Sequence, residues 1–194
     1  MNRDGYRGPM QPIDFAGFAG DCLISGKMTM FGERLTDFLN GQERFRIHHV
    51  EAESLEDGHK FAIDSVSVER DDLFAVVATG PRGAEKQRLQ LQTNRLQISI
   101  GPYLVLGRLH IAPGSDVMAS VLKRETMIPL TNATIAYEVA GTFVVRDLGA
   151  IIVNRMLVDW ISPTTEAQTV FPDVTVRSPF TARMLKDFTG GSTV

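Results

Sequence analysis

The side chains that could bind a metal ion are few and scattered along the chain. The sequence contains four histidines and one cysteine. His48 and His49 are neighbours on a predicted strand, so their side chains point to opposite faces and cannot share an ion. His59 lies beside a predicted turn, and His110 lies in the other half of the chain. A site built from protein ligands needs clustered His, Cys, Asp or Glu, so we predict no metal site.

Residues for nucleophilic or acid–base catalysis are equally sparse. No Gly-x-Ser-x-Gly motif occurs, and Cys22 begins a predicted strand rather than a helix, so we interpret it as a small core residue. Glu51 and Glu53 share one face of a predicted strand, which is compatible with acid–base work. A solvated outer face is the simpler interpretation. Because phosphate-binding glycine loops are also missing from the sequence, we predict no catalytic residue, no cofactor and no enzyme activity; an enzyme remains a third hypothesis.

The elements that position these residues come from an internal repeat. Three stretches of the first half recur in the second half in the same order. Cys22–Met30 matches Tyr103–Ile111, Ile47–Ala52 matches Ile128–Ala133, and Val68–Arg70 matches Val153–Arg155. The first two pairs are separated by 81 residues, and the third is separated by four residues more. Chance matches would not keep this order and spacing.

Each copy shows the same succession of periodicities. In the first strand, Leu23, Ser25 and Lys27 face one way while Met28 and Met30 face the other, and the central glycine predicts a bulge or a close backbone approach. A short helix follows in each copy, with Leu35 and Phe38 on the apolar stripe of the first and Ser115 as the N-cap of the second. The remaining predicted strands span residues 45–55, 61–68, 73–79, 127–139, 142–146 and 150–161, with turns at Asp57-Gly58 and Leu148-Gly149.

The sequence therefore predicts a mainly β fold with short helices. We expect a tandem duplication of a small β-barrel-like or sandwich-like unit, with one short helix per copy. The predicted segments are an N-terminal tail (1–20), a first unit (21–79), a connector (80–94), a second unit (95–163) and a C-terminal tail (164–194). A single irregular sandwich with coincidental similarity is the alternative. Whether the copies form two barrels or one fused sheet system stays open.

Two of these motifs resemble a group of short bacterial β-rich domains of unknown function. In that group an Arg-Leu-x-Asp-x-Leu-Asn helix follows a strand, and the unit ends in Val-Asn-Arg. The first copy has the helix motif at Arg34–Asn40 but Val68-Glu-Arg70 at its end. The second has Val153-Asn-Arg155 but a different helix. The resemblance implies the domain type and no activity.

Composition predicts a soluble, cytoplasmic protein. Hydrophobic residues make up 43% and charged residues 22% of the chain, as in globular proteins. No apolar run approaches the roughly 20 residues that span a bilayer, and the polar N-terminus has no signal-peptide core. A single cysteine excludes an internal disulfide and fits a reducing compartment.

Charge favours a protein partner or self-association over nucleic acid. Residues 21–79 carry a net charge of −6, whereas residues 95–163 carry +1, and nucleic-acid binding needs clustered cations. Our leading hypothesis is a non-enzymatic protein-interaction or assembly module that uses sheet edges and the helix faces around Leu35 and Phe38. The alternative is a nucleic-acid or nucleotide-binding small barrel, similar in spirit to Sm-like or PilZ-type domains, with Arg70, Arg155 and Arg82 as ligand contacts.

The C-terminal tail contains two further candidate elements. Val170–Val176 could add an edge strand, and Thr181–Phe188 could form an amphipathic turn or two. Both could dock on the protein's own core, and a partner groove is the alternative.

Overall fold

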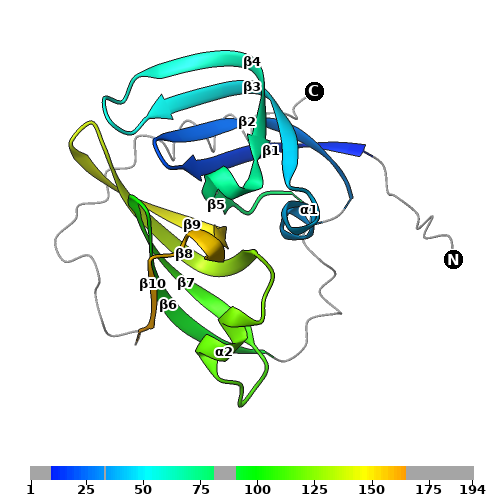
Figure 1. Ribbon diagram of the computed structural model, residues 1–194, viewed down its shortest axis with the longest axis vertical. Coiled ribbons are helices and arrows are strands. Elements are labelled where there is room, and N and C mark those ends of the chain that lie inside the picture. Colours follow the sequence, from blue (N-terminus) through cyan, green and yellow to red (C-terminus); the bar gives the residue numbers. More distant parts are fainter. Residues whose placement is uncertain (1–9, 33, 81–90, 165–194) are drawn as a thin grey trace, which may run out of the picture.

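Ten antiparallel strands form one continuous sheet in the computed structural model, which describes residues 10–32, 34–80 and 91–164 (Figure 1). The strands are β1 (Met10–Ala19), β2 (Cys22–Phe31), β3 (Arg44–Ser54), β4 (Lys60–Glu69), β5 (Leu73–Val77), β6 (Gln92–Ile100), β7 (Tyr103–Ile111), β8 (Met127–Val139), β9 (Thr142–Asn154) and β10 (Trp160–Pro163). The helices are α1 (Leu35–Gly41) and α2 (Val117–Leu122), and 3-10 turns lie at Arg70–Asp72 and Arg155–Leu157. The predicted mainly β fold with short helices is confirmed.

The two halves of the sheet have the same strand order. The sheet runs β10-β6-β7-β8-β9-β5-β1-β2-β3-β4. In each half the fifth strand pairs with the first, and the second, third and fourth follow in turn. The halves join because β5 of the first pairs with β9 of the second. The described strands leave β10 and β4 as edges, so they form one open sheet and no closed barrel.

The same backbone irregularity occurs at corresponding places in both halves. The ladder between the second and third strands shifts register at Gly26 in one half and at Gly107 in the other. Opposite each glycine lies a residue with positive φ, His49 (51°) or Asn132 (46°). A Cβ at Gly26 would lie 2.6 Å from Ile47 Cγ2, and one at Gly107 would lie 2.8 Å from Leu130 Cβ. The predicted close approach of backbone at these glycines is confirmed.

The registers also correct part of the sequence alignment. Arg70 N–H donates to Glu43 O, and Arg155 N–H donates to Thr126 O, each at 2.8 Å. These bonds and the shared bulge make Ile47 equivalent to Leu130, not to Ile128 as predicted. The error is a shift of two residues. Because side chains of a strand repeat their face every two residues, such a shift preserves the hydrophobic pattern and cannot be detected from it.

Two hydrophobic cores lie on opposite faces of the junction between the halves. The first core contains Phe15, Met28, Leu39 and Ile47 of the first half, and the second contains Tyr103, Leu109, Leu130 and Ile135 of the second half. The junction strands contribute to both. Val76 and Ile152 enter the first core, whereas Ala75, Ile151 and Val153 enter the second. This explains why the junction strands are continuous apolar runs, as is typical of strands buried on both faces.

Three predicted boundaries differ from the structure. Residues 10–19, which the prediction left in the N-terminal tail, form β1, because Pro12, Gly17 and Gly20 hide its strand pattern. The predicted turn at Leu148-Gly149 is wrong, since both residues lie inside β9 and the hairpin turn is at Ala140-Gly141, where both φ angles are positive. The N-cap of α2 is Asp116, whose side chain accepts from Ala119 N–H at 2.7 Å, and not Ser115.

Two side chains bind the backbone of the opposite half. Asn40 on α1 donates to Met127 O at 3.1 Å and accepts from Met127 N–H at 2.9 Å. Tyr103 Oη donates to Ala19 O, and its ring lies 5.4 Å from that of Phe18. These bonds add to the β5–β9 ladder and fix the halves against each other.

Replacing Gly26 with Ala should lower the free energy of unfolding by about 1–3 kcal/mol, because the new methyl group overlaps both Ile47 and the His48 carbonyl. Gly149→Ala is the matched control, since a Cβ there meets nothing within 4 Å. Urea denaturation measures both variants. Equal stability of the two would contradict the close approach at Gly26.

Asn40→Ala should destabilise the protein by about 1–3 kcal/mol, since it leaves a buried N–H and C=O of Met127 without the Asn40 amide. Asp37→Ala, on an exposed position of the same helix, should change stability by less than about 0.5 kcal/mol. Thermal or urea unfolding makes the comparison. An equally small effect at Asn40 would mean that this bridge does not hold the halves together.

Candidate functional site

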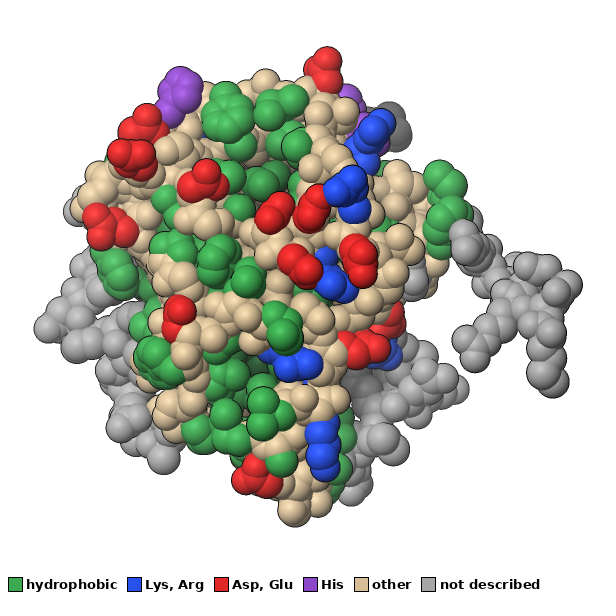
Figure 2. All heavy atoms as spheres, viewed as in Figure 1, with side chains coloured by type: hydrophobic (Ala, Val, Ile, Leu, Met, Phe, Trp, Pro, Cys, Tyr) green, Lys and Arg blue, Asp and Glu red, His purple; other side chains and the backbone are tan. Residues whose placement is uncertain are grey.

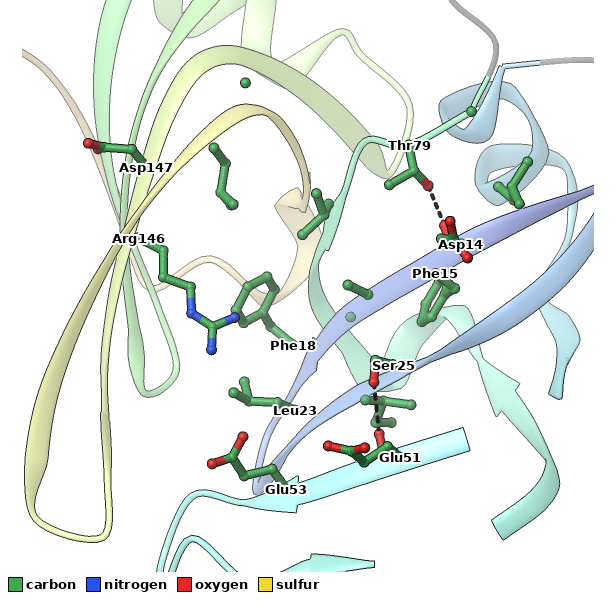
Figure 3. Close-up of a pocket in the computed structure, with 18 of the residues that line it drawn as sticks. Asp14, Phe15, Phe18, Leu23, Ser25, Glu51, Glu53, Thr79, Arg146 and Asp147 are labelled. Atoms are coloured by element: carbon green, nitrogen blue, oxygen red, sulfur yellow. Dashed lines mark hydrogen bonds between the residues drawn. The ribbon is translucent and has the colours of Figure 1, made fainter. Parts of the chain in front are cut away.

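A groove of about 540 Å³ lies beside the junction of the two halves, where β5 ends (Figure 3). Consecutive residues of two strands line its sides: 12–17 of β1 and 146–149 of β9. The end of β5 closes it with Val77, Thr79 and Gly80, and its floor is completed by Phe18, Leu23, Ile24, Ser25, Glu51 and Glu53. Runs of consecutive residues indicate that the edges of the strands, and not only their faces, border the groove.

The groove exists because β5 is much shorter than the strands beside it. β5 has five residues, whereas β1 has ten and β9 has thirteen. It pairs with β1 only at Gly17–Ala19 and with β9 only at Ile151–Val153. Farther along, Thr79 Oγ1 still donates to Asp14 O, and Ala78 N–H donates to Ala150 O. Beyond these bonds β9 departs from β1, because the β8–β9 hairpin crosses the outer face of the first half to the loop after β3, where Ala140 N–H donates to Leu55 O.

The groove floor is the outer face of the first half. Phe18 pairs with Leu23 across β1 and β2, and Leu23 pairs with Glu53 across β2 and β3. These three side chains therefore lie on one face of the sheet, and the buried Met28 and Met30 lie on the other. The alternation predicted for β2 is thereby confirmed. β9 faces this floor, and in Figure 3 the side chain of Arg146 points from β9 toward Phe18 and Leu23.

Arg146 is the cation that faces the groove floor. Burial lowers the pKa of its guanidinium below the usual value, while the nearby Tyr137 and Glu53 act in the opposite direction. The guanidinium carbon lies 5.4 Å from the centre of the Tyr137 ring, within the range of a cation–π contact. Burial also raises the pKa of Tyr137 to about 12. A desolvated cation next to apolar side chains is suited to binding a carboxylate.

Glu51 and Glu53 both line the groove, which agrees with the prediction that they share one face of their strand. Each is accompanied by Lys60, whose Nζ lies 3.7 Å from Glu51 and 3.3 Å from Glu53. Asp14 likewise forms an ion pair with Lys27 at 2.7 Å. These pairs engage three acidic side chains of the groove, of which Glu51 is mostly exposed (56%) whereas Glu53 is largely covered (16%). Acidic side chains on the first half are prominent in Figure 2.

Arg70 and Arg155, the two predicted ligand-binding arginines that the structure describes, are not brought together. Arg70 and Arg155 each begin a 3-10 turn, but β4 is an edge strand whereas β9 is central. Arg70 Nε donates to Asp71 at 2.9 Å, and Arg155 Nε donates to the carbonyls of Arg124 and Glu125. Arg82 lies outside the described residues. The nucleic-acid alternative therefore stays a prediction, with two of its cations already engaged within the protein.

The predicted helix-face contacts are mostly internal. Leu35 is 2% exposed and belongs to the first core. Phe38 is half-buried, and its ring lies 5.7 Å from that of Phe45. Exposed apolar side chains are found instead at several other places, among them Phe61 (44%) and Ile63 (41%) on the edge strand β4 and Leu122 (68%) at the end of α2.

The histidines and the cysteine are not clustered. Within the described parts of the chain, no group of three or more His, Cys, Asp or Glu could hold a metal ion. His48 and His49 are both exposed, because the left-handed residue His49 interrupts the alternation that predicted opposite faces. Cys22 is half-buried, and burial together with Asp21 raises the pKa of its thiol to about 11.

The sequence reasoning missed Arg146 and Leu148 as groove residues. Arg146 and Leu148 of β9 are equivalent to Phe61 and Ile63 of β4. In the first half Ala52 pairs with Phe61, and in the second half Ile135, the residue equivalent to Ala52, pairs with Arg146. The available signal was the apolar run at residues 150–153, which identifies β9 as a strand buried on both faces. The predicted turn at Leu148-Gly149 cut that strand short.

Among the described helices, none has the length and apolar character needed to cross a membrane. Comparisons with protein-family models, curated proteins and solved structures gave no match.

Alkylation of Cys22 by iodoacetamide at pH 8 should be roughly 100-fold slower in the folded protein than in urea, because only the thiolate reacts and its fraction falls with the raised pKa. The urea-unfolded chain is its own control. Mass spectrometry over time gives both rates. Similar rates in both states would contradict the burial of this thiol.

Proposed function

We propose that this protein is a non-enzymatic interaction module that binds an extended segment of a protein partner in the groove beyond the end of β5. The observation that carries the proposal is the shape of the groove, which is bordered by the edges of β1 and β9. Strand edges present backbone N–H and C=O groups that pair with an extended peptide. Side chains on the floor then select which peptide binds.

The groove chemistry supports a peptide with alternating character. Phe18, Leu23 and Leu148 offer apolar contacts, and Arg146 offers a positive charge that points toward Phe18 and Leu23 (Figure 3). An extended segment points alternate side chains to the same face. A ligand with apolar residues two apart and one acidic residue would satisfy both features. Within the described residues, no clustered cations or metal-binding group supports a different ligand at this place.

We also propose that the two halves derive from tandem duplication of one unit. The repeated element order, the matching bulges at Gly26 and Gly107, and the matching 3-10 turns support it. In this view the groove is a product of duplication, since it lies between strands of the two units. The first unit alone would expose β5 and would lack the wall formed by β9.

A peptide library displayed on phage tests the function. Selected peptides should bind the protein, and Ala16→Arg should weaken binding by at least about tenfold, because a long side chain on the groove floor occupies the space of the ligand. Thr29→Arg is the matched control: Thr29 is an exposed residue of β2 that does not line the groove. Fluorescence anisotropy with a labelled peptide measures the affinities.

Two outcomes would contradict the proposal. Equal binding of the selected peptides to both variants would place the interaction elsewhere. A library that yields no peptide able to bind the intact protein is the second such outcome. Circular dichroism and unfolding curves confirm first that both variants fold.

A further inference from the structure

The groove is closed at one end, because the tip of the β8–β9 hairpin rests on the first half. In Figure 1 this tip lies beside the turn between β3 and β4. Ala140 N–H donates to Leu55 O at 2.9 Å, and a Cβ on Gly58 would lie 3.5 Å from both Ala140 Cβ and Val139 Cγ1. A chain that follows the groove floor must therefore end or turn away at this point.

Arg146 lies at the closed end. Phe18, Leu23 and Glu53 pair with one another across β1, β2 and β3, so they form one row of the floor. Leu55, on which the hairpin tip rests, is only two residues beyond Glu53, so this row is the last before the closed end. The side chain of Arg146 points toward it (Figure 3).

In the other direction the floor continues toward exposed residues. The next row contains Ala16 and Ser25, and the row after it contains Asp14 and the exposed Lys27. From Asp14 to Phe18 the floor spans four residue steps, about 13 Å at about 3.3 Å per residue. This length suits the last few residues of an extended chain.

The surroundings of Arg146 suit a carboxylate. A guanidinium has five N–H donors in one plane, so it binds a carboxylate through two hydrogen bonds and keeps donors for other contacts. Below it, the Tyr137 hydroxyl is buried and has no hydrogen-bond partner among the described residues. A bound carboxylate supplies acceptor oxygens where these donors lie. Lys60 Nζ, 3.3 Å from Glu53, offsets the nearest negative charge.

We propose that the groove binds the free carboxyl terminus of its protein partner, with the terminal carboxylate on Arg146. The last side chain is apolar and packs against Phe18, Leu23 and Leu148. An internal Asp or Glu would also supply a carboxylate, but its chain would have to continue into the hairpin tip. The inference rests on the proposed function and specifies which part of the partner binds.

Two peptide libraries test the inference on the intact protein, one displayed with free carboxyl termini and one displayed within a fusion protein. The first should yield peptides that end in an apolar residue. One selected peptide is then synthesised with a free carboxylate, with a terminal amide, and with two glycines added after its last residue. Fluorescence anisotropy should show that the free acid binds at least about tenfold more tightly than either other form.

A pair of protein variants assigns the preference to one side chain. Arg146→Gln should bind the free acid and the amide with similar affinity, because the cation that contacts the carboxylate is gone. Arg46→Gln is the matched control and should keep the preference, since Arg46 is an exposed residue of β3 that does not line the groove. The three peptides are also compared on the unaltered protein, so the test does not depend on how either variant folds.

Three results would overturn the inference: equal affinity of the unaltered protein for the acid and the amide, undiminished binding of the extended peptide, and a preference for the free acid that persists in Arg146→Gln. If one of these occurs while Ala16→Arg still weakens binding, the proposed function stands and only the specificity for a carboxyl terminus is lost. If neither library yields a peptide that binds in the groove, both proposals are wrong.

Discussion

The pairing of β5 with β9 is the interaction on which the rest of the structure depends. Three residue pairs join the halves: Ala75 with Val153, Val76 with Ile152, and Val77 with Ile151. Their side chains enter two cores on opposite faces of the sheet. All of these residues except the half-buried Val77 are fully buried, so the junction combines a backbone ladder with the removal of apolar surface on both sides. Neither core is complete without strands from the other half.

The same pairing explains why the sheet ends where it does. By register, Ser67 of β4 corresponds to Ile152, and Ser162 of β10 corresponds to Val77. Each free edge thus has a hydroxyl where the junction has an aliphatic side chain. Pro163 also removes a backbone donor from β10, which is typical of edge strands that avoid further pairing. The chain forms the junction once and does not favour repeating it between molecules in that register.

Periodicity predicted most of the fold because it reports burial. The strands at residues 127–139 and 61–68 and the helix within Arg34–Asn40 follow directly from one-sided apolar patterns. β1 was missed because Pro12 and three small residues weaken its pattern, and its burial depends on β5, which is distant in sequence. The shift of two residues in the alignment was undetectable because the pattern repeats every two residues. The groove depends on the lengths of three strands that meet only in the tertiary fold, so the apolar run at residues 150–153 could identify β9 as a strand but could not place Arg146 and Leu148 in a groove.

The proposed binding position is the groove at the junction of the two halves, beside the end of β5. Its most direct test is isotope-filtered NMR of the labelled protein with an unlabelled peptide selected from the library. We predict intermolecular NOEs from the peptide backbone to the amides of Asp14 and Ala16 on β1 and to Leu148 on β9. NOEs confined to Phe61 and Ile63 on the edge strand β4 would contradict the groove and place the interaction at the free edge of the sheet.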